Sequence, residues 1–348
     1  MAVVTKISAR KILASLGDET VEARVELADA RSASASVPAG ISAGKSEVKK
    51  VPADEAIREI GEMGKSCEGK DWTQEGLDRE ISARDYGGNA TLAVSAALWK
   101  ALNLETPPAG KFPKLMVLMF EGGKHGNANI TIQEFLVVED SLEEARRDFF
   151  RVRKYLEEQN AETTVGAEGG FSPLSYTNEQ ALETIKKVLP GKSIALDVAG
   201  TFKQGQALDY GLLLSKFPIV SLEDPYGDED WEKWAEFTKT HGQKILVVGD
   251  DLVTTNRERI EKASLLSAVN AVIIKPNQIG TITATLEAVT TARKAGLKII
   301  VSHRGEETDD DWIADLAVAV KADYVKFGGM DRGERIAKYN RLAQLGMK

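Results

Sequence analysis

The chain has 348 residues, 43% hydrophobic and 28% charged, with a formal net charge of −8 and a single cysteine, Cys67, so it is long enough for one or two domains with a large core. One cysteine excludes a disulfide framework and a cysteine-based zinc site, and without a basic block no nucleic-acid partner is expected. No run of about 18 apolar residues predicts a membrane span, and no signal-peptide core follows Met1, so a cytoplasmic location is expected.

The first elements expected in the chain are the two strands of a hairpin. Apolar and charged residues alternate over residues 21–27, which is typical of a strand with one buried face. Its expected partner is residues 7–13, joined through a turn at Gly17-Asp18. The small residues of 32–47 are either a plain connection or a mobile lid whose backbone amides bind a ligand.

Two helices are expected next, at residues 53–65 and 89–102. The second is made mostly of small apolar residues, which predicts close packing around most of its surface. Three prolines and a glycine between Asn103 and Pro113 indicate a domain boundary. We therefore expect an α+β domain over residues 1–112 and a second domain over residues 113–348.

The second domain is predicted to open with two strands and two helices. The strands are expected at residues 115–120 and 130–138. Ser141 and Thr177 each stand three residues before a Glu or Gln, the capping-box pattern that begins a helix. Two strands followed by two helices depart from simple strand–helix alternation.

Six short apolar runs then each end in a polar or charged residue, at positions 197, 223, 250, 275, 303 and 326. The spacing of 23 to 28 residues is typical of one strand, one helix and their loops. Unbroken apolar runs predict strands buried on both faces, and the repeat predicts a (β/α) barrel with catalytic residues at the carboxyl ends of its strands. The expected helices are 208–216, 229–240, 256–264, 281–295, 309–320 and 332–345.

Three carboxylates, those of Asp197, Glu223 and Asp250, end successive strands. Neighbouring barrel strands bring such ends together, and ionised carboxylates need a cation to share a small space because like charges raise one another's pKa. Oxygen ligands without cysteine or paired histidine indicate Mg²⁺ or Mn²⁺ rather than Zn²⁺. The alternative is that each carboxylate caps a helix or pairs with a surface lysine.

A lysine and a glutamate are candidates for proton transfer. Lys275 ends the next strand, and a nearby divalent cation favours the neutral amine of a general base; the alternative is that it balances the carboxylate charge. Glu168 lies in a turn where Gly169-Gly170 let the backbone approach a ligand. It is either a general acid or a solvated turn residue.

The last two strands end in cationic residues, His303-Arg304 and Lys326. Arginine binds phosphate or carboxylate with two parallel hydrogen bonds and lysine acts as a point charge, so both suit an anionic substrate. A lone histidine is usually structural, so His125 and His303 are candidates only through their neighbours.

Six short motifs, in this combination, resemble the enolase family, and the resemblance covers nearly the whole chain. The motifs are Gln133-Glu-Phe135, Gly166-Ala-Glu-Gly-Gly170, Ser221-Leu-Glu-Asp-Pro225, Gly249-Asp-Asp-Leu252, Ile274-Lys-Pro-Asn-Gln-Ile-Gly-Thr281 and Ser302-His-Arg304. Each motif alone is weak evidence, whereas several in order are specific. The resemblance implies an α/β fold, an enolase-type ββαα(βα)6 TIM-like barrel with an N-terminal α+β capping domain. It also implies a Mg²⁺-dependent lyase of glycolysis, a phosphopyruvate hydratase that interconverts 2-phosphoglycerate with phosphoenolpyruvate and water.

The resemblance further implies roles for individual residues. The tighter Mg²⁺ would be held by Asp197, Glu223 and Asp250, and Ser42 would help place a second Mg²⁺ that the substrate completes. Proton transfer would use Lys275 on C2, Glu168 on the departing 3-hydroxyl, Glu134 as its support and His303 beside the leaving group. Arg304, with the Gly305 amide, would bind the phosphate of the small phosphorylated carboxylate, and Lys326 would bind its carboxylate. The other substrate-binding residues would be His125 and Gln133, which line the site, and Ser42.

The sequence departs from the family pattern at two informative places. Gly305-Glu306 replaces the usual Ser-Gly, which removes a serine hydroxyl from the phosphate site, and Glu306 would repel a phosphate unless it is turned away. Ser15-Leu-Gly-Asp-Glu19 lacks the arginine with which the family makes a dimer contact, so the resemblance does not decide whether a homodimer forms.

Three functions therefore stay open from the sequence. The first is the lyase reaction on 2-phosphoglycerate. The second is proton abstraction from a different carboxylate by another enolase-superfamily enzyme, which the change at Gly305-Glu306 motivates. The third is a non-catalytic binding protein that keeps the barrel.

Overall fold

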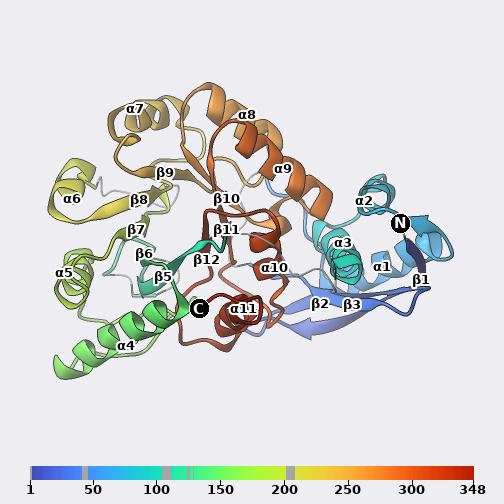
Figure 1. Ribbon diagram of the computed structural model, residues 1–348, viewed down its shortest axis with the longest axis horizontal. Coiled ribbons are helices and arrows are strands. Elements are labelled where there is room, and N and C mark those ends of the chain that lie inside the picture. The colour runs from blue at the N-terminus through green and yellow to red at the C-terminus, as the bar shows by residue number, and fades with distance from the viewer. Residues whose placement is uncertain (1, 41–45, 104–110, 124–125, 128, 201–207) are drawn as a thin grey trace.

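The computed structural model describes residues 2–40, 46–103, 111–123, 126–127, 129–200 and 208–348 (Figure 1). Two assemblies of strands are present, a four-stranded sheet near the N-terminus and a closed eight-stranded barrel. None of the described helices is long and apolar enough to cross a membrane.

The N-terminal sheet has the strand order β3-β2-β1-β4. Its strands are β1 (Ala2–Leu13), β2 (Glu19–Leu27), β3 (Ser32–Ser36) and β4 (Asp71–Trp72). The predicted hairpin is confirmed, because β1 pairs with β2 in antiparallel register across a turn in which Gly17 has a φ of 100°. Residues 32–47 were expected to be a connection or lid; instead the first five of them pair with β2 as an edge strand.

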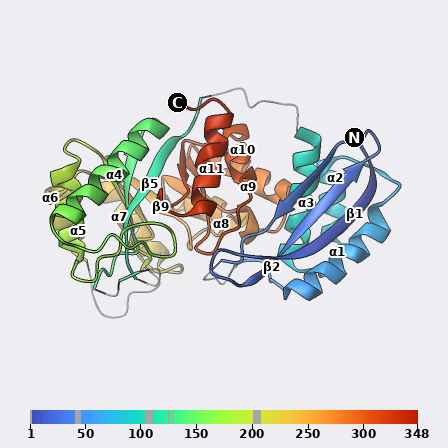
Figure 2. The same cartoon turned by 90° about the horizontal axis from the view of Figure 1, so that it is seen from below.

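Three helices cover one face of this sheet, as Figure 2 shows. They are α1 (Ala53–Cys67), α2 (Gln74–Ser82) and α3 (Gly88–Asn103). The sequence did not lead us to expect α2, a short helix that Thr73 caps by accepting a hydrogen bond from the Gly76 amide. The prediction for α3 is confirmed, because it packs on β2 and β3 and also on the barrel helix α9 (Ile282–Lys294).

The barrel begins with β5 (Lys114–Glu121) and β6 (Glu134–Glu139), and β6 runs antiparallel to both of its neighbours. All other neighbouring pairs are parallel, in a ring that β12 closes against β5. The remaining strands are β7 (Ile194–Asp197), β8 (Ile219–Glu223), β9 (Leu246–Gly249), β10 (Ala271–Ile274), β11 (Lys298–Ser302) and β12 (Tyr324–Lys326). The predicted barrel is therefore confirmed.

Helices surround the barrel on the outside (Figure 1). Two follow β6, namely α4 (Leu142–Glu158) and α5 (Asn178–Val188), and one follows each later strand. These are α6 (Tyr210–Lys216), α7 (Trp231–His241), α8 (Arg257–Leu265), α9, α10 (Trp312–Ala319) and α11 (Gly333–Gln344), with the short helix η2 (Pro276–Gln278) before α9. The order is ββαα(βα)6, as the resemblance implied.

One strand is shorter than its apolar pattern predicts. Residues 130–138 were expected to form it, but β6 starts only at Glu134. The Asn178 side chain accepts hydrogen bonds from the amides of Thr131 and Ile132, so this backbone is satisfied by a side chain instead of a strand.

A small apolar layer fills the barrel interior below the strand ends. Its buried members are Met116, Leu118, Leu136, Ala195, Val248, Ala271, Ile273 and Ile300. They come from six of the eight strands and close the centre to water, so polar side chains inside the ring gather at its carboxyl mouth.

The N-terminal helices are hydrogen-bonded to the barrel. Asp78 of α2 accepts hydrogen bonds from the amide and hydroxyl of Thr283, and Thr91 of α3 donates to the carbonyl of Gly280. Lys100 pairs with Asp310 at 2.8 Å. The division into domains at residue 112 stays a prediction.

Candidate active site

A pocket lies at the carboxyl mouth of the barrel. It is lined by Glu47, Gln133, Glu134, Glu168, Asp197, Ala199, Asp224, Asp250, Asp251, Lys275, Gln278, Ser302, His303, Arg304, Gly305 and Lys326. Every predicted site residue that the structure describes lines this pocket, except Glu223, which reaches it through Lys326. Ser42 and His125 lie outside the described residues.

Acidic groups outnumber cations in this pocket. Its lining holds seven carboxylates, those of Glu47, Glu134, Glu168, Asp197, Asp224, Asp250 and Asp251, and three cations, those of Lys275, Arg304 and Lys326. The difference, seven minus three, is an excess of four acidic groups in the lining. Such an excess in a buried place favours the binding of further cations.

The ammonium group of Lys326 stands at the point where three carboxylates meet. It lies 2.8 Å from Glu223, 2.9 Å from Asp197 and 3.2 Å from Glu134. Burial lowers the pKa of Lys326, but these acids outweigh burial and the pKa is raised well above its usual value. Burial and the neighbouring carboxylates raise the pKa of Glu134 and Glu223. The sequence analysis placed Lys326 on a substrate carboxylate, whereas its partners here belong to the protein.

A second ion pair joins Lys275 to Asp250. Burial raises the pKa of Asp250, but Lys275 and Lys326 reverse this effect, and the net pKa is lowered. Burial lowers the pKa of Lys275, but Asp250 and further acids such as Glu223 together outweigh burial, and the net pKa is raised. The pair therefore keeps both groups charged.

Two further aspartates were not in the predicted site. Asp224 follows Glu223, and its carboxylate accepts hydrogen bonds of 2.9 Å from the amides of both Asp250 and Asp251. It thus fixes the backbone from which Asp250 projects. Burial, followed by the charge of Asp250, raises the pKa of Asp251 to about 7. The adjacent acids in Glu223-Asp224 and Asp250-Asp251 were the available sequence signal.

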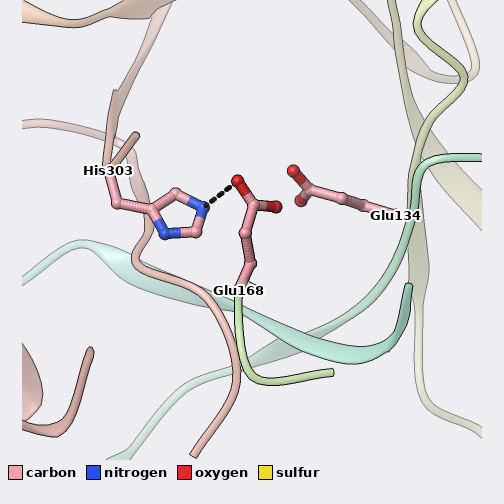
Figure 3. A group of neighbouring side chains, drawn as sticks. All are labelled: Glu134, Glu168 and His303. Atoms are coloured by element: carbon pink, nitrogen blue, oxygen red, sulfur yellow. Dashed lines mark ion pairs between the residues drawn. The ribbon is translucent and has the colours of Figure 1, made fainter. Parts of the chain in front are cut away.

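The opposite side of the pocket holds Glu134, Glu168 and His303, which point toward one another (Figure 3). Nε2 of His303 lies 3.9 Å from Oε1 of Glu168. The Glu168 turn is held by Glu121, whose carboxylate accepts hydrogen bonds from the amides of Glu168 and Gly170. Glu121 was missed by sequence reasoning because it ends an apolar strand and carries no motif.

The guanidinium of Arg304 is paired with Glu47, at 3.0 Å and 3.3 Å through two nitrogens. Both side chains are nearly buried, 6% and 4% exposed. Gly40 leaves room for this arrangement, since a Cβ atom there would lie 3.1 Å from a guanidinium nitrogen. Any anion that binds Arg304 in this way must first replace Glu47.

Glu306 does not point into the pocket. Its carboxylate accepts hydrogen bonds from the amides of Leu16 and Asp18, at the tip of the N-terminal hairpin. Only Gly305 of this pair lines the pocket. The repulsion expected between Glu306 and a bound phosphate therefore does not arise here.

The donor set fits a divalent cation that prefers oxygen. Carboxylates of Asp197, Glu223 and Glu134 already surround a positive charge, and the buried Oε2 of Glu134 has no hydrogen-bond partner among the described residues. Among the described residues, two groups of three possible ligands have their ligand atoms within 4.8 Å of one another, namely Glu134-Glu168-His303 and Asp224-Asp250-Asp251. The predicted set of Asp197, Glu223 and Asp250 is not one of these groups, since lysines stand between its members.

One comparison with known families bears on this site. The family model described as Enolase, C-terminal TIM barrel domain, matches residues 111–204 and 189–347. The two matches together run through the whole barrel and include every residue of the pocket except Glu47.

Proposed function

Because the chain belongs to the family described as Enolase, C-terminal TIM barrel domain, we propose that it is a Mg²⁺-dependent lyase that interconverts 2-phosphoglycerate with phosphoenolpyruvate and water. The observation that carries this proposal is the convergence, in one buried pocket, of a carboxylate-rich cation site, a lysine and a glutamate–histidine pair. Proton abstraction next to a carboxylate needs these three components. A glycolytic role in the cytoplasm is part of the same proposal.

Asp197, Glu223 and Asp250 would hold the tighter Mg²⁺, and the acidic pocket is compatible with such an ion. When bound, Mg²⁺ would neutralise the substrate carboxylate and the negative charge that develops on it. Asp224 supports this site by fixing the backbone of Asp250. A second Mg²⁺, placed with the help of Ser42, belongs to the proposal through the family resemblance.

Lys275 is the proposed base for the proton on C2. Its ammonium is now paired with Asp250, and a paired ammonium cannot accept a proton. Once Asp250 exchanges it for another cation, the attraction that raises the pKa of Lys275 is lost, and the ammonium can release its proton to solvent and become the neutral amine that accepts the proton from C2. Base strength at Lys275 and cation binding at Asp250 are therefore linked in this proposal.

Glu168 is the proposed acid that protonates the departing hydroxyl. Glu134 stands beside it with a pKa raised well above its usual value, caused first by burial, so Glu134 takes up a proton more readily than a free glutamate and would then support Glu168 with less negative charge. Burial and Arg335 lower the pKa of His303 well below its usual value, so its ring is neutral beside Glu168.

The substrate anions would bind the cations of the pocket. Arg304 and the Gly305 amide would hold the phosphate after Glu47 is displaced, and the inward position of Gly305 with Glu306 turned away supports this assignment. Lys326 would bind the carboxylate. Roles for Gln133, His125 and Ser42 are proposed from the resemblance.

A second candidate is a different enolase-superfamily reaction, in which the substrate carries a carboxylate but no phosphate. The Glu47–Arg304 pair favours it, because the guanidinium that should bind phosphate is already neutralised. A non-catalytic binding protein is the third candidate.

The deciding experiment is an assay of phosphoenolpyruvate formation from 2-phosphoglycerate with and without Mg²⁺. The proposal expects turnover that requires the ion. An inert 2-phosphoglycerate together with proton exchange at C2 of other carboxylates would favour the second candidate. If calorimetry detected no Mg²⁺ binding, the non-catalytic reading would be preferred.

A further inference from the structure

A buried arginine links the loops that carry the proposed acid and its histidine neighbour. Arg335 lies in the first turns of α11, has 0% exposure and is among the largest fully buried side chains of the described chain. A buried guanidinium is costly unless its donors are satisfied. Nε has no hydrogen-bond partner among the described residues and lies 3.4 Å from Glu334, so the partners of the two terminal nitrogens are the informative ones.

The guanidinium of Arg335 donates to two loops at once. One nitrogen donates to Nδ1 of His303 at 2.7 Å and to the carbonyl of Arg304 at 2.6 Å. The other donates to the carbonyl of Gly305 at 2.7 Å and to that of Ala167 at 3.2 Å. A single side chain thus joins the loop after β11 to the turn that holds Glu168.

The contact with Nδ1 determines which ring nitrogen of His303 carries the proton. A guanidinium donates hydrogen bonds and cannot accept them, so Nδ1 must be the acceptor. The proton of the neutral ring is then on Nε2, the nitrogen that lies 3.9 Å from Glu168. The side of the ring that faces Glu168 is therefore a donor (Figure 3).

The packing leaves little freedom for another arrangement. Gly328 sits between the three groups, and a Cβ atom there would lie 2.5 Å from the carbonyl oxygen of Glu168, 3.0 Å from the His303 ring and 3.1 Å from the Arg335 stem. The Gly329 amide also donates to that carbonyl, at 2.9 Å. These contacts fix Glu168 and His303 relative to each other through Arg335.

We propose that Arg335 is a positioning residue, which fixes His303 as the Nε2–H tautomer and holds that N–H toward Glu168. The part of this proposal that concerns catalysis rests on the proposed function. In the dehydration direction, a neutral donor beside Glu168 would orient the hydroxyl that leaves without competing for the proton that Glu168 delivers. A histidine with the proton on Nδ1 would present a lone pair there instead.

The tautomer can be tested without any substrate. The chain has three histidines, so selective ¹⁵N-histidine labelling gives few signals, and the His303→Gln variant assigns the signal of His303. We expect an unprotonated Nδ1 and a protonated Nε2 across neutral pH. A proton on Nδ1, or a doubly protonated ring at neutral pH, would overturn the proposal whatever the protein catalyses.

The catalytic part is tested with Arg335→Lys, which keeps the charge but cannot donate at all four positions. We expect kcat to fall by on the order of 100-fold, the size typical of a small misplacement of catalytic groups, with a much smaller change in KM. The pH profile should also gain a histidine titration, because the variant loses a hydrogen bond to Nδ1 that only the neutral ring can accept. The charged groups that act on His303 are Arg335, Glu168, Lys326 and Lys275.

The matched control is Arg341→Lys on the same helix, which weakens a two-point pair with Asp315 on the protein exterior. Its kinetics and its His303 spectrum should equal those of the wild type. A folded Arg335→Lys variant with wild-type kcat and pH profile would refute the positioning role. If Arg335→Lys does not fold, the tautomer of His303 in the wild-type protein still decides the proposal. If the wild-type protein is inactive on 2-phosphoglycerate, only the proposed function is contradicted.

Discussion

The two rims of the barrel both hold ionic clusters that include buried carboxylates, but only one of them is balanced. At the amino rim, the carboxylates of Glu139, Glu144 and Asp148 meet the cations Lys192, Arg147 and Arg151, so three charges of each sign neutralise one another. At the carboxyl mouth, seven carboxylates face three cations. A cluster that is complete by itself stabilises the fold, whereas an incomplete cluster is left to be completed by a ligand.

The two clusters also differ in what holds them. The amino-rim cluster brings together the end of β6, helix α4 and Lys192 shortly before β7, mainly through contacts between their side chains, and the Val188 carbonyl also accepts a hydrogen bond from Arg151. At the mouth, backbone amides and carbonyls are recruited as well, by Asp224, Glu121 and Arg335. Such supporting contacts keep charged groups in place when their partners are exchanged for a ligand.

The largest expected effect is at the mouth, in Lys275→Ala. A general base contributes roughly 10²- to 10⁴-fold to rate, so turnover of 2-phosphoglycerate should fall by at least about 100-fold while the protein stays folded. The measurement is the phosphoenolpyruvate assay together with circular dichroism. Wild-type turnover in this variant would remove Lys275 from the mechanism.

Addition and removal of metal should act on the mouth alone. Mg²⁺ is expected to raise the melting temperature in proportion to its binding, and a chelator should reverse the rise. In Asp197→Asn, at least about ten times more Mg²⁺ should be needed for the same rise in melting temperature. This corresponds to a loss of about 1.4 kcal/mol in the free energy of Mg²⁺ binding. Glu144→Gln at the amino rim is the control and should leave it unchanged. If both variants lost the response to Mg²⁺ equally, the contrast between a complete cluster at the amino rim and an incomplete cluster at the mouth would be wrong.

The amino rim should instead give a pH dependence of stability. Burial raises the pKa of Glu139 from 4.5 to about 7, so the folded state binds the proton more tightly than the unfolded state. The stability from this group is then present below pH 4.5 and is lost as the pH rises through about 7. Glu139→Gln should remove this decline, which is worth about 2 kcal/mol.

Chemical unfolding at pH 5 and pH 8 measures this difference. Glu144 supplies the opposite sign, because its ion pair with Lys192 lowers its pKa. Its contribution is present above the unfolded pKa of 4.5 and is lost only as the pH falls below that value, so Glu144→Gln should reduce stability at pH 5 and at pH 8 alike. If the free energy of unfolding depended on pH in the same way in both variants, burial of Glu139 would not be the cause of that dependence.

The smallest expected effect concerns Glu47. Because its carboxylate occupies Arg304, Glu47→Gln should let inorganic phosphate or 2-phosphoglycerate bind about fivefold more tightly, equal to about 1 kcal/mol. Calorimetry with phosphate gives the number, and Glu306→Gln is the control, since Glu306 faces the hairpin. Weaker binding in Glu47→Gln would show that Glu47 positions Arg304 instead of competing for it.

Much of the fold could be predicted because strands and helices leave local patterns. The six strand ends at 197 to 326 lie within one residue of the observed ends of β7 to β12. Two features that were not predicted, α2 and the start of β6, have local causes too. One is a short helix that contains Gly76, and the other is an apolar stretch whose amides bind the side chain of Asn178.

The candidate site could be predicted only in part. Strand ends and motifs located the acids, Lys275 and the His303-Arg304 pair in one pocket. They did not show that Lys326 would stand among Asp197, Glu223 and Glu134, or that Glu121, Asp224 and Arg335 would support the site. These residues carry ordinary sequence signals for a strand end, a loop and a helix.

The sequence by itself determined the barrel, its chain order and which residue types reach its mouth, because a run of apolar residues and the residue that ends it are neighbours in the chain. Only the tertiary structure decided which charge neutralises which. Glu47 and Arg304 are 257 residues apart, and Lys326 and Asp197 are 129 apart. Ion pairs depend on distances of a few ångströms in space, and these distances exist only after the ring of strands has closed.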